Sequence, residues 1–366
     1  MFLNFYVKDR DAVWDMEVAW MEEYGTSFSP REMEAIADTL LVLYAQADGY
    51  IAAHPIAQAH GLESYEDYTR WKSITIQPED SLDEQQLYDY LCSYQTEDIM
   101  SRILQTEAVV EQYRLVQEQV QIYGYINDFF EEITPREINH AKAVFHGADE
   151  VWQNFLPSGA VNISTATDFA ILTVLCLYLL LGPALTRDRI TRMAPLQYAS
   201  RRGRNVAWIQ LAAYLLTAVI VATASLLLHG ALIVYKSGWY AFLNCRTFSF
   251  FTAMYCWPNW SLGVWYLVLA AIHYIMALTV ASVLFLLSRC SGNHISMLLK
   301  AIPAFAAFVY FLSTLMTFAF YYANRLYRFT GIPYIEAIVP PVLAALSLSL
   351  CAVFIKRITR QDILTS

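Results

Sequence analysis

Two histidines, His229 and His273, lie inside the most apolar stretches of this 366-residue chain. An ionisable side chain in such a stretch is a functional candidate, because burying a charge in hydrocarbon costs free energy. A neutral imidazole can instead form a hydrogen bond to a neighbouring helix. We favour this structural hydrogen bond as the interpretation, and a proton-relay or substrate-binding role is the alternative.

Other sequence patterns that carry chemistry do not occur. The pairs His54/His60 and His140/His146 lack the i, i+4 spacing that places two imidazoles on one helix face around a metal ion. The chain has no GxSxG pattern, no HExxH pattern and no Walker A pattern. We therefore expect neither an enzyme nor an ATPase in this chain, and neither a metal nor a cofactor.

The cysteines give no sign of a metal site or a redox motif. Cys245 and Cys256 share a predicted loop, but in a continuous helix they would lie roughly 16 Å apart, too far to bridge. We expect them not to pair, although a loop that folds back leaves pairing open. The chain has six cysteines, without a CxxC pair: Cys92, Cys176, Cys245, Cys256, Cys290 and Cys351.

Charge is divided unequally along the chain. Residues 1–165 hold 29 Asp and Glu against 9 Lys and Arg, a net charge of −20, and residues 166–366 hold 4 acidic and 15 basic residues, a net charge of +11. We therefore expect an acidic domain over residues 1–165 and a transmembrane domain over residues 166–366.

Apolar runs of roughly 20 residues, the length that crosses a bilayer as a helix, occur only in the second domain. They predict a mainly α, polytopic membrane protein. We expect five membrane helices, at residues 169–185, 206–235, 262–287, 297–322 and 337–355. Asp168 lies at one end of the first and Lys300 near one end of the fourth, so we expect both side chains to reach the membrane surface.

Arginines concentrate between the first two of these helices, over residues 187–204, and the tail carries Lys356, Arg357 and Arg360. Because Lys and Arg in short loops mark the cytoplasmic side, we expect the C-terminus inside and residues 1–165 outside. The N-terminal residues show neither a signal peptide nor a membrane helix. Either a first helix is missing, which we favour, or the acidic domain is cytoplasmic and the arginines are outside.

The acidic domain has the pattern of a helical domain. Capping boxes are predicted at Ser29 to Glu32 (SPRE) and Thr134 to Glu137 (TPRE), and a further cap is predicted at Ser64. A long helix is predicted over Glu97 to Ile122. The face predicted to be buried after the first cap consists of Met33, Ile36, Leu40, Leu43, Ala47 and Ile51.

The arginine-rich segment and the helices around it resemble the permease subunits of type-2 ATP-binding-cassette (ABC) exporters of Gram-positive bacteria. The likeness rests on Asp188-Arg189, Leu196-Gln197-Tyr198 and Arg202-Gly203-Arg204, and on the later turn LLSRCSGN at 286–293. It departs from the family where the usual first membrane helix is absent. The resemblance implies a coupling loop that contacts the motor subunit through Arg187, Asp188, Arg189, Arg192, Leu196, Gln197, Tyr198, Arg201, Arg202 and Arg204.

The resemblance also implies a function and its partners. A separate ABC ATP-binding subunit would supply the energy, and a second permease copy or a paralogue would complete the transporter in the bacterial cell membrane. Membrane lipids are expected partners and nucleic acid is not. The alternative is a sensor or assembly protein that does not transport and whose outer domain binds a ligand or a partner. The substrate stays open.

Overall fold

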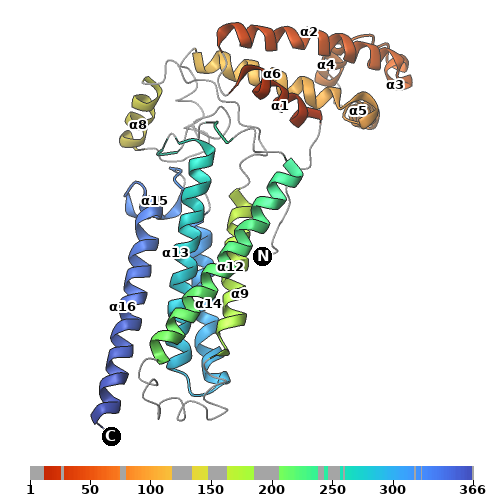
Figure 1. Ribbon diagram of the computed structural model, residues 1–366. Helices are drawn as coiled ribbons and strands as arrows, with labels where there is room; N and C mark the ends of the chain where they lie inside the picture. Colours follow the sequence, from red (N-terminus) through yellow and green to blue (C-terminus); the bar gives the residue numbers. More distant parts are fainter. Residues whose placement is uncertain are drawn as a thin grey trace. The chain divides into compact units, whose positions relative to one another are not determined.

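The structure is a computed structural model. It describes residues 12–25, 29–74, 80–117, 134–146, 163–184, 206–237, 243–245, 256–258, 260–316, 319–322 and 324–364. The chain divides into two compact units (Figure 1). The first, which we call the helical unit, contains residues 8–161 and 237–254, and the second, the membrane unit, contains residues 1–7, 162–236 and 255–366. The regular elements of the described residues are all helical, which confirms the predicted fold class.

The helical unit is built around two long antiparallel helices, α2 and α6. Helix α1 also packs against α6, and α3 and α4 pack against α2 (Figure 1). The elements of this unit are α1 (Ala12–Tyr24), α2 (Pro30–Ala53), α3 (Pro55–Ala59), α4 (Tyr65–Ile74), α5 (Asp80–Leu91), the single-turn helix η1 (Tyr94–Thr96), α6 (Ile99–Gln117) and α8 (Pro135–His146).

Both predicted capping boxes are present. The hydroxyl of Ser29 accepts a hydrogen bond from the Glu32 amide, and the Glu32 carboxylate accepts one from the Ser29 amide. At the second box the Thr134 amide donates to Glu137 Oε2 at 2.9 Å, and the Glu137 amide donates to Thr134 Oγ1 at 3.4 Å. Each box satisfies backbone amides that the first turn of a helix leaves without a partner.

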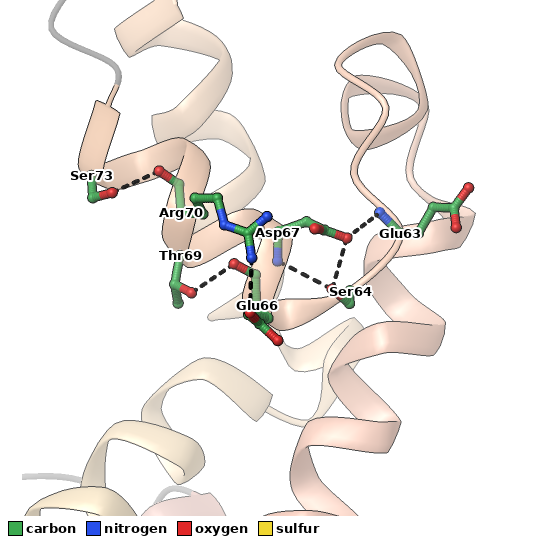
Figure 2. A network of polar contacts seen from close by, with 7 residues as sticks. All are labelled: Glu63, Ser64, Glu66, Asp67, Thr69, Arg70 and Ser73. Carbon is green, nitrogen blue, oxygen red and sulfur yellow. Dashed lines mark hydrogen bonds and ion pairs between the residues drawn. The ribbon is translucent and has the colours of Figure 1, made fainter.

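The predicted cap at Ser64 starts α4 (Figure 2). Ser64 Oγ accepts from the Asp67 amide at 3.1 Å and donates to Asp67 Oδ2 at 2.8 Å. The same carboxylate accepts from the Glu63 amide at 3.4 Å. Because these donors favour the charged carboxylate, led by the Ser64 hydroxyl, the pKa of Asp67 lies below its usual value.

The core of the helical unit contains the predicted face of α2. Met33, Ile36, Leu43, Ala47 and Ile51 are all buried, and Leu40 is half-buried. Hydrophobic side chains of α5 and α6 close the core from the other side. The main buried cluster is Leu43, Ala47, Ile51, Ala57, Leu62, Tyr68, Leu87, Leu91, Ile99, Met100 and Ile103.

The predicted start of the long helix is wrong. Helix α6 begins at Ile99, because Glu97 and Asp98 both have a φ of 52°, in the left-handed region that a right-handed helix cannot contain. The predicted end at Ile122 lies outside the described residues.

Among its described residues, the membrane unit contains four helices that are long and apolar enough to span a bilayer. These are residues Val206–Ala231, Leu262–Arg289, His294–Met316 and Ile335–Arg357. The first predicted span forms a helix as well, but its apolar part, Thr167–Leu181, is shorter. The elements of this unit are α9 (Ile163–Leu181), α12 (Val206–Ser237), α13 (Leu262–Arg289), α14 (His294–Met316), α15 (Arg325–Thr330) and α16 (Ile335–Leu364).

Two predicted span ends are wrong. Helix α9 ends at Leu181 rather than at residue 185, because Gly182 and Pro183 form a turn there. Helix α14 ends at Met316 rather than at residue 322, and Phe320 beyond it has a φ of 69°. The sequence over residues 316–322 is apolar enough to continue a span, but the backbone forms a turn at Ala319 and Phe320.

Helix α13 is the centre of the membrane unit. Of its 18 most apolar consecutive residues 56% are buried, against 17–28% in the other three candidate spans. It packs against α9, α14 and α16 (Figure 1). The polar side chains of α13 are therefore the ones that the other helices shield most completely.

Candidate functional site

Four buried polar side chains from three helices meet inside the membrane unit. They are Thr173 on α9, Ser225 and His229 on α12, and His273 on α13, and each is less than 9% exposed. We call them the polar cluster. It contains both histidines that the sequence analysis selected.

Hydrogen bonds and a ring contact hold the polar cluster together. Thr173 Oγ1 donates to the Phe169 carbonyl at 2.9 Å and lies 3.1 Å from His273 Nε2. Since the one hydroxyl proton of Thr173 is used by that carbonyl, the imidazole Nε2–H of His273 is the donor in the second bond. Ser225 Oγ donates to the same carbonyl at 3.2 Å, so α12 and α13 are both tied to one turn of α9.

His229 is the member of the cluster with spare hydrogen-bonding capacity. Its ring stacks on Phe169 with 4.8 Å between the ring centroids. Its Nε2 is buried and has no hydrogen-bond partner among the described residues.

These contacts assign different properties to the two histidines. His273 forms the interhelical hydrogen bond expected of a neutral membrane histidine. His229 keeps Nε2 available for a proton or a polar ligand. A buried polar atom without a partner costs free energy, and such atoms inside membrane helices are functional candidates.

Asp168, which precedes Phe169 on α9, is not exposed as we expected. Its position near the end of a span predicted a side chain that reaches the membrane surface, as Lys300 does. The structure instead buries Asp168, which is 7% exposed. Lys300 is exposed and its Nζ donates to the Cys290 carbonyl at 2.8 Å.

A second group of contacts joins the ends of α9, α12 and α13, on either side of the arginine-rich segment. Tyr214 OH donates to the Leu181 carbonyl at 2.8 Å, and Ser288 Oγ donates to the Gly182 carbonyl at 3.0 Å. Nearby, the buried Arg289 bonds to the Gln210 side chain. We call this group, Leu181, Gly182, Tyr214 and Ser288, the three-helix junction.

The arginine-rich segment itself lies outside the described residues. That segment contains every residue predicted for the coupling loop, from Arg187 to Arg204. The described helices fix its two ends, since α9 precedes it and α12 follows it at the three-helix junction.

At the opposite end of the membrane unit, two buried polar residues join α14, α15 and α16. Asn324 caps α15 and donates from its side-chain amide to the carbonyls of Thr314 and Leu315 at 3.3 and 3.2 Å. Glu336 is fully buried, and its Oε1 accepts from the Phe320 amide at 3.4 Å. Sequence reasoning missed both: Glu336 is one of only four acidic residues after residue 165, but the predicted span began one residue later.

Cys245 and Cys256 are not joined by a disulfide, as we expected. Cys245 and Cys256 are both buried free thiols. Burial raises the pKa of the Cys245 thiol to about 12 and also raises the pKa of the Cys256 thiol. Both thiols therefore stay protonated and unreactive at neutral pH.

The four membrane-length helices of the described residues define the class: the chain is a multi-pass α-helical membrane protein. No family model matches the chain, and no curated protein or solved structure is significantly similar to it. A finer assignment therefore depends on the site itself.

The bond between Thr173 and His273 is expected to be weak in free energy. A double-mutant cycle of Thr173→Val and His273→Leu should give a coupling of about 0.6 kcal/mol, the typical value between membrane helices. Equilibrium unfolding in mixed detergent measures it. A coupling of zero within error would mean that the two side chains do not interact, whatever each substitution does alone.

Proposed function

We propose that this chain is the membrane-spanning permease subunit of an ABC exporter, which moves its substrate with energy from a separate ATP-binding subunit. The observation that carries the proposal is the position of the arginine-rich segment. It joins α9 and α12, which bond to each other at both the three-helix junction and the polar cluster. The α9 side also bonds to the central helix α13 at both places. A force on this segment therefore reaches the buried histidines through two rigid helices.

The coupling works through a short chain of contacts. Arginine guanidinium groups pair well with carboxylates on a partner surface. Displacement of the segment would move the ends of α9 and α12 at Leu181 and Tyr214 relative to α13. The Phe169 carbonyl lies on α9 about three turns before Leu181, and it accepts hydrogen bonds from Thr173 and Ser225. Movement of α9 would shift Phe169, on which the ring of His229 stacks.

The proposed topology follows from where the basic residues lie. The basic residues Arg289, Lys300, Lys356 and Arg357 lie at the same end of the membrane helices as the end of α9 and the start of α12, which flank the arginine-rich segment in the sequence. That end is proposed to be cytoplasmic, because Lys and Arg in short loops stay inside. The helical unit is then extracytoplasmic, and the location is the cell membrane of a bacterium. A second permease copy would complete the transporter.

Co-purification tests this proposal. The full-length chain, extracted in mild detergent from its own host, is expected to bring down an ATP-binding subunit. Arg201→Glu with Arg204→Glu should remove most of that subunit, because reversed charges repel the carboxylates that bind the loop. A matched control is Arg325→Glu with Arg328→Glu, the same charge change on exposed residues of α15 at the opposite end, which should retain it.

The outcomes separate the two classes of function. If no ATPase co-purifies with the unaltered chain, the permease proposal is wrong and a sensor or assembly role replaces it. If both charge reversals lose the subunit equally, the segment is not the docking site. Equal yield and equal thermal midpoints of the variants exclude misfolding as the cause.

A further inference from the structure

An apolar groove runs between α9 and α14 on the membrane unit. Its volume is about 470 Å³, within the usual range for small-molecule sites. The side chains that line it are almost all hydrophobic, and they include Leu175, Tyr178, Leu179, Leu298, Ile302 and Phe305. The polar cluster contributes no residue to this groove, so it is a separate feature.

The shape of the groove follows from how the two helices touch. A Cβ on Gly182 would lie 2.5 Å from the Tyr178 carbonyl oxygen, so the turn that ends α9 requires glycine here. The flexible side chain of Met297 on α14 packs against the same glycine, and its Cε would lie 2.9 Å from that Cβ. Farther along, Tyr178 and Phe305 pack edge to face with 5.1 Å between centroids. At these two contacts α9 and α14 touch, and the groove lies beside them.

The groove opens toward the surroundings of the helices. Leu179, Leu298 and Ile302 on its rim are 68%, 55% and 63% exposed. Exposed apolar side chains of this size on a membrane-spanning helix face lipid, where their exposure has no cost. An occupant that enters from the side therefore enters from hydrocarbon and must itself be apolar.

A lysine outside the groove lining, Lys300, places its ammonium group at the turn that precedes one end of the groove. His294 lines the groove there, and Lys300 on α14 reaches back to the turn between α13 and α14, where its Nζ bonds to the Cys290 carbonyl. An ammonium group has three N–H donors, and this bond uses one. The Tyr178 hydroxyl is buried beside the groove and has no hydrogen-bond partner among the described residues.

We infer that this groove binds one acyl chain of an anionic phospholipid, whose headgroup phosphate lies at the Lys300 end. The apolar lining fits the chain, and the positive charge at one end complements the phosphate. Basic pockets between membrane helices on the cytoplasmic side are typical sites for anionic headgroups. The inference requires that α9 and α14 lie in the membrane with the Lys300 end on the cytoplasmic side, so it rests on the topology proposed above but not on transport itself.

Lipid binding is measured by native mass spectrometry of the delipidated full-length protein. The probes are phosphatidylglycerol and phosphatidylcholine with identical acyl chains. The anionic lipid is expected to bind more tightly, and Lys300→Gln should reduce its affinity about fivefold, the effect of one lysine at a membrane surface. Lys356→Gln, at an exposed lysine of α16, is the matched control and should leave the affinity unchanged.

Blocking the groove tests the position of the acyl chain. Leu298→Trp should fill the groove and reduce binding of both lipids at least tenfold. Leu267→Trp, at an exposed leucine of α13 that does not line the groove, should have no effect. Inorganic phosphate at millimolar concentration should not displace the lipid, since it lacks the chain.

Several results would overturn the inference. Equal binding of the two lipids, or equal effects of Lys300→Gln and Lys356→Gln, would contradict the proposed contact between the headgroup and Lys300. Equal effects of Leu298→Trp and Leu267→Trp would contradict the proposed position of the acyl chain in the groove. A delipidated protein that becomes dimeric and binds no lipid would show that a second copy covers this surface instead.

Discussion

Replacing Leu87 by alanine is expected to lower the free energy of unfolding of the helical unit by about 2–5 kcal/mol. Leu87 on α5 is fully buried in the cluster that includes Leu43, Ile51 and Ile103. The truncated side chain loses its transfer free energy and leaves a cavity that packed helices refill only in part. Because a whole domain is stable by only about 5–15 kcal/mol, this single change is a large fraction of the total.

Hydrogen exchange of the full-length protein measures the effect, through the protection of amides in α2 and α6. The matched control is Leu82→Ala on the same helix, where the leucine is 62% exposed. An exposed substitution of this kind should change the free energy by at most about 0.5 kcal/mol. Equal losses for the two variants would contradict the assigned packing of α5.

Local features of the fold were predictable from the sequence. The capping boxes at Ser29 and Thr134 need only residues three positions apart, so their geometry is determined within one turn. The buried face of α2 follows from helical periodicity alone. The four membrane-length helices follow from apolar length, because a continuous apolar run of about 20 residues satisfies its own backbone in a bilayer as a helix.

Predictions failed where contacts between distant residues decide the backbone. The apolar sequence after Met316 reads as a continued span, yet the chain turns at Phe320, whose amide bonds to Glu336 sixteen residues later. Hydropathy carries no information about that bond. The start of α6 failed for a local reason that spacing does not reveal, the left-handed conformations of Glu97 and Asp98.

The candidate site was predictable in part. An apolar context alone selects His229 and His273. It cannot show that His273 meets Thr173, one hundred residues away, or that His229 stacks on Phe169. The position of Asp168 at the end of a span predicted an exposed side chain, but the side chain is buried. Burial depends on which helices pack around the end of α9, and the sequence does not give this. The predicted coupling loop stays a prediction, because it lies outside the described residues.

Asn324→Ala is expected to destabilise the membrane unit by about 2–4 kcal/mol. Asn324 is fully buried, and its Oδ1 accepts from the Leu326 and Tyr327 amides at 2.9 and 3.4 Å. Its Nδ2 donates to the carbonyls of Thr314 and Leu315. Alanine removes a helix cap, worth about 1 kcal/mol, and leaves buried carbonyls unpaired, at about 1–3 kcal/mol.

Asn293→Ala provides the matched control, because Asn293 also caps a helix but is exposed and accepts from the Ser296 amide at 2.8 Å. It should cost about 1 kcal/mol, the value of a cap alone. Unfolding in mixed detergent gives both free energies, and hydrogen exchange should rise at α15 only for Asn324→Ala. Asn324→Asp separates the two halves of the interaction, since aspartate keeps the cap but cannot donate to the carbonyls. If Asn324→Asp matches the unaltered protein, the bonds to α14 contribute nothing, and the turn between α14 and α16 is held by the α15 cap and the Phe320–Glu336 bond instead.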